Sequence, residues 1–315
     1  AGTRLTYIPA RRTLYVEPRL RLHHEGTAAG LGPYAVRMAG GLYRQFVNRF
    51  EASSTSPTAI LPSMRFWMPV GTSHAPPRAY HATIDAQIQP RDGWTVTGET
   101  YYKHYARLLM LDYTVLHTGG AASLTAAEPV SPTAAIAATT GFALGGGVAL
   151  TRAGRRVEST LRYDWSQSRR RFPARFGGRM VPVPWNQPHQ LSMSGEGALT
   201  DALRVRLRAE HSWGQSWGFR RIYYDYLGTQ PDAYVGASLQ HPSSHTLAPR
   251  TRVDLGVGYT VRWGGITLET RLDLVNVLGH QSPFDWGLRP TNDGTTRTTR
   301  RLPGRRLVGA VTIRY

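Results

Sequence analysis

The 315-residue sequence predicts an all-β protein in which antiparallel strands form a transmembrane β-barrel of about a dozen strands. Three observations support this fold class. Apolar and polar residues alternate over runs of about ten residues, the length that a tilted strand needs to cross the hydrocarbon layer. Short turns and long loops alternate along the chain. Aromatic residues stand at the ends of the apolar faces, where a bilayer has its interfaces.

The alternation is clearest near the C-terminal end. Apolar side chains occupy every second position of residues 253–263, and the pattern resumes over residues 266–274 after Gly264-Gly265. Two alternating runs joined by a Gly-Gly pair predict a β-hairpin, and residues 307–315 predict a last strand. On the apolar face of the first run are Val253, Leu255, Val257, Tyr259, Val261 and Trp263, and on its polar face are Arg252, Asp254, Gly256, Gly258, Thr260 and Arg262.

A soluble β-sandwich also has alternating strands, but its strands are usually about five or six residues long. Tyr259, Trp263 and Tyr315 stand where the aromatic girdle of a barrel would lie. The polar face carries charges of both signs, as expected of a wall that faces a water-filled lumen. These features favour the membrane barrel over the soluble β-domain, although period two alone does not separate them.

Loop length provides a further argument. Outer-membrane barrels have short periplasmic turns and longer extracellular loops, whereas a soluble sandwich has no reason to sort its loops by end. In this sequence the predicted turns at 89–93, 152–156, 198–202 and 264–265 alternate with long loops at 107–141, 169–189, 215–249 and 279–304. The C-terminus then falls on the periplasmic side.

The remaining strands follow from the same alternation. In chain order the predicted strands are 3–8, 14–23, 34–46, 80–88, 94–105, 142–150, 157–168, 189–197, 203–213, 253–263, 266–274 and 307–315. Pro18 within a strand requires an edge or irregular pairing. Residues 24–32 read as a connection, and 48–77 as a long loop with a short strand at 64–68. The glycines at 145–147 indicate close approach or bending of strands rather than a phosphate cradle, since no strand-to-helix turn follows.

Composition excludes some classes of protein. The formal net charge is +18, and Lys103 is the only lysine among 38 basic side chains. The arginines are spread along alternating strands rather than gathered on one helix or tail, so nucleic-acid binding is not favoured. Other partners for this charge are the lipopolysaccharide of an outer leaflet and an anionic ligand. No apolar run is long enough for a transmembrane helix, and no cysteine is present for a disulfide or thiolate site.

Several short motifs resemble the barrels of TonB-dependent outer-membrane receptors. Residues 16–20 (VEPRL) resemble a strand motif of that family, and residues 254–305 are similar to its terminal strands. Asn276-Val277-Leu278 resembles a motif near the end of the penultimate strand. Further similar stretches are Gly98–Lys103, Leu161–Ser166 and Val183–His189.

This resemblance implies a function and a set of partners. Such receptors have 22 strands, a plug domain in the lumen and a segment that engages TonB. Residues 1–315 are expected to form one partial barrel domain, similar to the C-terminal half of that barrel, without the plug domain and first strands. The family takes up scarce ligands such as ferric siderophores, cobalamin or oligosaccharides across the Gram-negative outer membrane. The implied partners are outer-membrane lipid and lipopolysaccharide, the ligand, and the TonB complex through a plug domain that this sequence lacks.

No catalytic motif is found, so the sequence does not indicate an enzyme. It contains no HExxH, no Walker loop and no G-x-S-x-G elbow. The spacing of the histidines, including His23-His24, does not support a metal site, and no cofactor is expected. Glu269 and Asp273 share a strand face with Arg271, which favours a charge ladder over acid–base chemistry.

Two groups of residues are candidates for ligand binding. The first is an inward arginine ladder, which would attract anions; the alternative is that its members pair with nearby carboxylates or with a plug. Its members are Arg204, Arg206, Arg208, Arg252 and Arg271. The second is a set of loop residues that give large contact area at low entropic cost, with girdle or loop packing as the alternative. It contains Trp217, Arg220, Tyr223, Tyr224 and Trp286, near Trp213, Phe219, Tyr226 and Phe284.

Two other interpretations remain open. One is a complete passive porin-like or autotransporter-like barrel of roughly a dozen to fourteen strands. The other is a soluble, arginine-rich β-protein that binds nucleic acid or polysaccharide with a strong dependence on salt. A plug domain encoded upstream would distinguish the receptor from the pore, and partition into detergent would distinguish both from the soluble protein.

Overall fold

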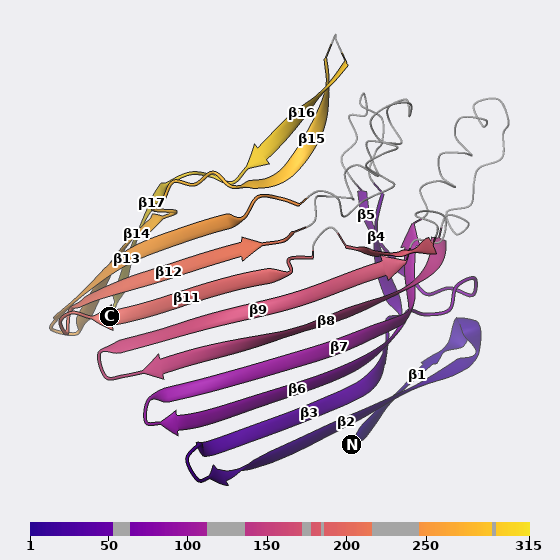
Figure 1. Cartoon of the computed structure of the whole chain (residues 1–315), viewed down its shortest axis with the longest axis horizontal. Helices are drawn as coiled ribbons and strands as arrows, with labels where there is room; N and C mark the ends of the chain where they lie inside the picture. Colours follow the sequence, from indigo (N-terminus) through magenta and orange to yellow (C-terminus); the bar gives the residue numbers. More distant parts are fainter. Residues whose placement is uncertain (53–63, 112–135, 172–177, 184–185, 216–245, 292–293) are drawn as a thin grey trace.

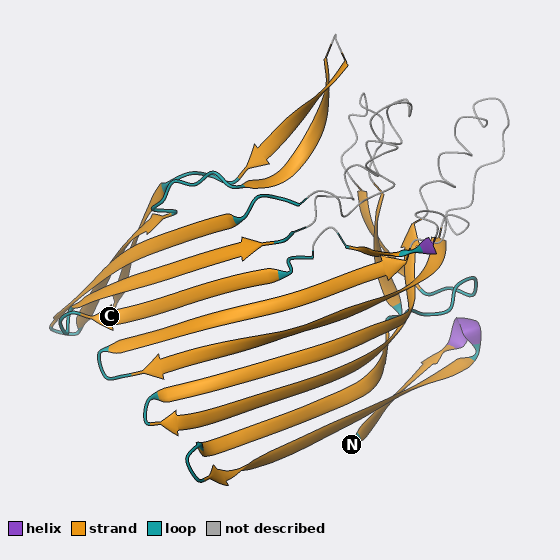
Figure 2. Ribbon diagram, viewed as in Figure 1, coloured by secondary structure: helices purple, strands orange, loops and turns teal. Residues whose placement is uncertain are grey.

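A single curved layer of antiparallel strands forms the body of the protein in the computed structural model (Figures 1 and 2). The structure describes residues 1–52, 64–111, 136–171, 178–183, 186–215, 246–291 and 294–315. The main sheet has 13 strands, which agrees with the predicted number. They are β1 (Gly2–Ile8), β2 (Thr13–Ala28), β3 (Gly32–Arg44), β6 (Arg78–Arg91), β7 (Trp94–Leu111), β8 (Ile136–Ala153), β9 (Val157–Arg171), β10 (Met180–Pro182), β11 (His189–Ala198), β12 (Leu203–Trp213), β13 (Arg250–Trp263), β14 (Ile266–Val275) and β17 (Arg306–Arg314).

Strands that follow one another in the main sheet are hydrogen-bonded neighbours, apart from β10, which pairs only with β9. The order is β1-β2-β3-β6-β7-β8-β9-β11-β12-β13-β14-β17. Among the described strands, β1 and β17 each pair on one side only, so the sheet is open at both edges. Unpaired backbone groups at an edge are costly in lipid, because no water is present to satisfy them.

Turns are sorted by end, as the sequence predicts. Short turns join β2 to β3, β6 to β7, β8 to β9, β11 to β12 and β13 to β14, all at one end of the sheet (Figure 1). The connections at the opposite end are long, apart from the short 3-10 turn Pro9–Arg11 between β1 and β2. The C-terminus lies at the short-turn end, because Arg314 on β17 pairs with Thr267 beside the turn at 264–265.

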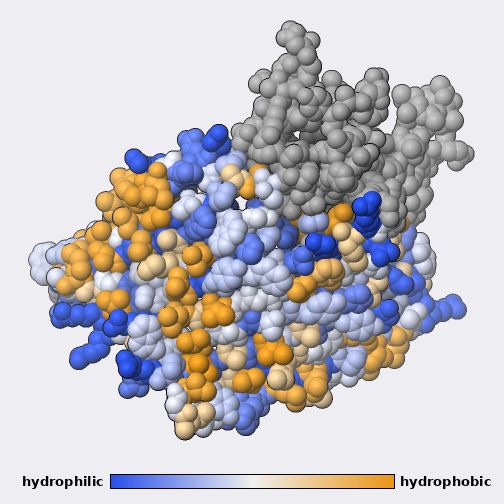
Figure 3. Space-filling model, in the orientation of Figure 1, coloured by the Kyte–Doolittle hydropathy of each residue, from blue (hydrophilic) through white to orange (hydrophobic). Residues whose placement is uncertain are grey.

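The two faces of the sheet differ in chemistry. Even positions of β12 and β13, and the positions paired with them, define the inner face, and odd positions define the outer face. The outer face is apolar and exposed: Leu255, Val257 and Tyr259 have 45%, 45% and 49% of their surface accessible. None of the described elements covers them as a second layer. Figure 3 shows such hydrophobic side chains in patches on the surface, with hydrophilic ones between them.

The predicted strands are correct, but several are longer than expected. β2 continues to Ala28, through residues that were expected to form a connection. β7 continues to Leu111 and β8 begins at Ile136, so both include residues of the predicted loop at 107–141. The predicted loop at 279–304 contains a hairpin of β15 (Pro283–Thr291) and β16 (Gly294–Arg301). The short strand predicted at 64–68 is present as β5 (Met64–Pro69), and it pairs with β4 (Val47–Ala52), most of which was expected to belong to the loop at 48–77. Both hairpins lie off the main sheet.

Pro18 and the glycines at 145–147 have local explanations. Pro18 pairs with Thr3 on β1, but the pairing of β2 with β3 begins only at Arg19. The missing N–H of Pro18 therefore costs no backbone hydrogen bond between β2 and β3. A Cβ atom at Gly145 would lie 2.6 Å from the carbonyl oxygen of Trp165 on β9. This confirms that glycine permits the close approach of neighbouring strands.

Within the described residues, no helix has the length and apolar character needed to cross a membrane.

Candidate ligand site on the inner face

The arginine ladder lies on the inner face of β12, β13 and β14, as the alternation predicts. Period two places an acid and an arginine two residues apart on the same side of a strand, where their side chains meet. Arg252 donates two hydrogen bonds to Asp254, from Nε to Oδ1 at 2.9 Å and from Nη2 to Oδ2 at 2.6 Å. Nε of Arg271 donates to Oδ2 of Asp273 at 2.5 Å.

Two more members of the ladder have carboxylate partners. Nη1 of Arg204 donates to Oε1 of Glu196, on the neighbouring strand β11, at 2.8 Å. Nε of Arg208 lies 3.6 Å from Oε1 of Glu210 on its own strand. Pairing within the sheet, which the sequence left as the alternative to ligand binding, therefore holds for four of the five arginines.

Arg206 differs from the other members of the ladder. Among the described residues it has no ion pair, and its Nε is buried without a hydrogen-bond partner. Its neighbour across β12 and β13 is Gly256, which offers no side chain. On its other side Arg206 pairs with Glu196 on β11, but the Glu196 carboxylate accepts a hydrogen bond from Arg204 instead.

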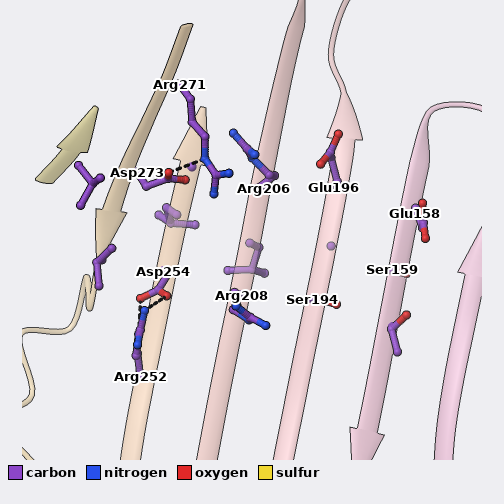
Figure 4. Close-up of a pocket in the computed structure, with 17 residues that line it drawn as sticks. Glu158, Ser159, Ser194, Glu196, Arg206, Arg208, Arg252, Asp254, Arg271 and Asp273 are labelled. Atoms are coloured by element: carbon purple, nitrogen blue, oxygen red, sulfur yellow. Dashed lines mark hydrogen bonds and ion pairs between the residues drawn. The ribbon is translucent and has the colours of Figure 1, made fainter. Parts of the chain in front are cut away.

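A hollow of about 490 Å³ lies on the inner face around these residues (Figure 4). Its wall is formed by β9, β11, β12, β13, β14 and β17. Figure 4 shows Arg206 and Arg208 on the strand between Glu196 on one side and Asp254 on the other. Arg204 is the only member of the ladder that does not line this hollow.

A second group of charges lies further along the same face. Arg162 on β9 donates hydrogen bonds to both carboxylate oxygens of Asp164 and to Glu99 on β7. Arg37 on β3 lies 3.4 Å from Asp85 on β6. Of these residues, Arg37, Asp85, Glu99 and Arg162 line a hollow of about 370 Å³. Acids therefore accompany arginines along the inner face, which explains how a sheet with so many arginines avoids strong repulsion.

The second group of predicted ligand residues is not brought into this site. Trp217, Arg220, Tyr223 and Tyr224 lie outside the described residues. Trp286 lies on β15, where only the backbone is described. Their role in ligand binding stays a prediction, as does that of the arginine ladder.

An aromatic cluster on the outer face was not recognised from the sequence as a unit. The His189 ring stacks on Trp213, with centroids 4.9 Å apart and an interplanar angle of 6°, and the Tyr163 hydroxyl lies 2.8 Å from Nδ1 of His189. His211 lies against Trp213 with centroids 5.2 Å apart. His189, His211 and Trp213 are near the long-loop ends of β11 and β12, the position of an interfacial girdle, and Tyr163 lies beside them on β9. The sequence did contain a signal for this cluster, because all four residues have odd numbers in strands whose odd positions share one face.

The described residues contain no group of three or more His, Asp or Glu side chains placed to hold a metal ion. The inner face instead offers guanidinium groups, carboxylates and hydroxyls in a water-accessible hollow. Such groups bind polar or charged molecules through hydrogen bonds and ion pairs.

Solved structures of outer-membrane receptors have the same fold. The ferric enterobactin receptor PfeA from Pseudomonas aeruginosa (a G324V mutant) is similar with a TM-score of 0.62 and 12% identity, over 98% of this chain and 41% of that chain. The outer membrane transporter YddB from Escherichia coli has a TM-score of 0.57 and 11% identity, over 98% and 42%. The siderophore receptor PirA from Acinetobacter baumannii has a TM-score of 0.55 and 11% identity, over 95% and 41%.

The chain thus spans about two fifths of the length of these receptors. No protein-family model matches the sequence, and no curated protein sequence does. The described strands form an antiparallel sheet of the kind found in outer-membrane receptor barrels. The predicted resemblance to part of the barrel of TonB-dependent receptors is confirmed at the level of the fold.

Proposed function

We propose that this chain forms part of the wall of an outer-membrane receptor barrel that takes up a scarce ligand with energy from the TonB complex. The main support is the contrast between the two faces of one sheet. The outer face exposes apolar side chains such as Val257 and Ile313, at 45% and 62%, without a covering layer among the described residues. The inner face carries hydrogen-bonded charges such as Arg252 and Asp254. An apolar outer face is compatible with contact to lipid, and a charged inner face is compatible with a water-filled lumen.

The proposed ligand is a ferric siderophore, cobalamin or an oligosaccharide. PirA and PfeA are described as siderophore and ferric enterobactin receptors, which favours the first class. The arginine-rich inner face would attract a ligand that carries anionic groups. Capture by the long loops at the end opposite the short turns would place the ligand at the mouth of this lumen.

The proposed partners follow from the same arrangement. The outer face would contact outer-membrane lipid and lipopolysaccharide, with the aromatic cluster of Tyr163, His189 and Trp213 at one interface. A plug domain, which the described residues do not contain, would occupy the lumen and engage TonB. The open edges at β1 and β17 would be closed by further strands, because a barrel in lipid has no free edges.

The protein produced from its complete gene provides the test. It should fractionate with the outer membrane, require detergent for extraction and change its migration on a gel when heated. Cells that produce it should accumulate a radiolabelled ferric siderophore from a panel, and deletion of tonB should abolish the uptake. Uptake that does not depend on TonB and falls with solute size would indicate a passive pore instead. Release into a soluble fraction without detergent would contradict both.

A further inference from the structure

Arg206 is the member of the arginine ladder whose charge is left without a partner. Among the described residues no carboxylate lies within ion-pair distance of it, and its buried Nε donates no hydrogen bond. A guanidinium group has five N–H donors in one plane, and a buried donor without an acceptor raises the free energy of the folded state. An arrangement of this kind is stabilised when an acceptor enters from outside the sheet.

The sheet leaves room for such an acceptor. Gly256 and Gly258 on β13 form the surface under the Arg206 guanidinium: a Cβ atom at Gly256 would lie 3.5 Å from Nε, and one at Gly258 would lie 3.4 Å from Nη2. Oδ1 of Asp273 occupies the space over Gly256, whereas at Gly258 the next nearest atom is the backbone oxygen of Thr270 at 3.8 Å. Glycine at position 258 therefore leaves room beside the guanidinium. The hollow of about 490 Å³ is within the usual size range of small-molecule sites.

The nearest acids in the sheet are already engaged. Glu196 pairs with Arg206 in the strand register, but its carboxylate accepts from Nη1 of Arg204 at 2.8 Å. Asp273, which pairs with Gly256, accepts from Nε of Arg271 at 2.5 Å. Each of these carboxylates is hydrogen-bonded to another arginine, and neither lies within ion-pair distance of Arg206, whose Nε remains available to another acceptor.

We propose that Arg206 is the centre of a carboxylate-binding site on the inner face, an inference that rests on the proposed role of this face as a lumen wall. A carboxylate matches the guanidinium with two parallel hydrogen bonds, which a single-atom acceptor cannot make. The carboxylate belongs either to a free ligand in the lumen or to a polypeptide segment that fills the lumen. The two sources share one chemistry and are separated by experiment.

The test replaces the guanidinium by an amine that can be trapped. The Arg206→Lys variant of the protein from its complete gene is treated in detergent with a water-soluble carbodiimide, with and without citrate, and the products are mapped by mass spectrometry. An amide between residue 206 and citrate identifies a site for a free ligand. An amide to an acid on a segment outside this sheet identifies a luminal segment as the occupant. Either product supports the site.

Absence of an amide, or an amide only with Glu196 or Asp273, overturns the proposal, because the sheet then satisfies this charge itself. Arg204→Lys is the matched control: its side chain is paired with Glu196, so its amide should form there and should not change with citrate. A wild-type protein that is not extracted with the outer membrane would count against the proposed function instead. The two failures are therefore distinct.

A measurement on the wild-type protein covers the case in which Arg206→Lys does not fold. Phenylglyoxal modifies accessible arginines, and citrate should slow modification of Arg206 about tenfold, the effect expected for a charged hydrogen bond. If a luminal segment holds the site, Arg206 should be protected before citrate is added. Arg204, whose side chain is 62% exposed, supplies the reference rate. Modification of Arg206 at the rate of Arg204, with and without citrate, contradicts the proposal.

A second variant fills the site from within. Gly258→Asp places a carboxylate beside Nη2 of Arg206, and it should remove the protection by citrate while leaving the reactivity of Arg204 unchanged. Gly98→Ala is a matched control, since nothing lies within 4 Å of a Cβ atom there. Protection by citrate that persists in Gly258→Asp would place the bound carboxylate elsewhere and overturn the assignment to Arg206.

Discussion

Oδ1 of Asp254 accepts a hydrogen bond from the backbone N–H of Asn276 at 2.8 Å. The same carboxylate is held by Arg252 through two hydrogen bonds. Asn276 in turn donates from Nδ2 to the carbonyl oxygens of His280 and Pro303, at the two ends of the segment that carries the β15–β16 hairpin. One carboxylate therefore links the inner face to the base of a hairpin that extends beyond the sheet (Figure 1).

Replacement of Asp254 by alanine should lower the free energy of unfolding by about 1–3 kcal/mol, because a charged acceptor of three hydrogen bonds is lost. The Asp254 side chain is 15% exposed, so solvent compensates only partly. The measurement is urea-induced unfolding of the protein in detergent micelles. Glu196→Ala is the control: its pair with Arg204 is more exposed, at 40% and 62%, and its loss should change stability by less than about 1 kcal/mol. Equal effects of the two substitutions would refute the special position of Asp254.

Substitutions of Asn276 separate backbone conformation from side-chain contacts. Its φ of 56° is in the left-handed region, which glycine adopts freely and alanine does not. Asn276→Ala should be less stable than Asn276→Gly by about 1 kcal/mol. Both variants lose the bonds to His280 and Pro303, so both should be cleaved faster than wild type within residues 283–301 in limited proteolysis. Cleavage at the wild-type rate would show that these bonds do not hold the hairpin.

Charge on the outer face should prevent membrane assembly. Val257→Arg exposes a guanidinium to lipid, at a cost of about 2–4 kcal/mol near the bilayer midplane. The folded fraction, measured by heat-modifiable migration, should fall accordingly. Thr260→Arg is the control on the inner face, where position 260 pairs with Glu269. If Val257→Arg assembles as well as Thr260→Arg, lipid does not contact the odd positions of β13.

A methyl group at Gly145 should force β8 and β9 apart. The added Cβ would lie 2.6 Å from the backbone oxygen of Trp165 and 2.8 Å from the Tyr101 hydroxyl, and a backbone atom cannot move away cheaply. Gly145→Ala should lower stability by about 1–3 kcal/mol, the usual effect of overpacking. Gly98→Ala has open space and should be neutral within about 0.5 kcal/mol. Urea midpoints of the two variants that coincide would contradict the predicted crowding.

The parts of the fold that could be predicted are those in which one face of a strand is apolar. β13 and β14 alternate cleanly, so their existence, faces and turn at Gly264-Gly265 were evident. β16, with the sequence GTTRTTRR, has no apolar residue, so it shows no alternation of apolar and polar positions from which a strand could be predicted. β2 was predicted to end early because Gly26 and Ala28 resemble a connection, although its pairing with β3 continues to Ala28.

The sequence alone determined which side chains share a face, because successive residues of a strand point to opposite sides and this depends on no other strand. It therefore placed the five arginines together and proposed acids beside them. The tertiary structure decided which arginine remained without a partner, since the register of β12 sets Gly256 of β13 and Glu196 of β11 opposite Arg206, and the Glu196 carboxylate accepts from Arg204. Register depends on pairing between segments about fifty residues apart in the chain, and each strand's own alternation contains no information about that alignment.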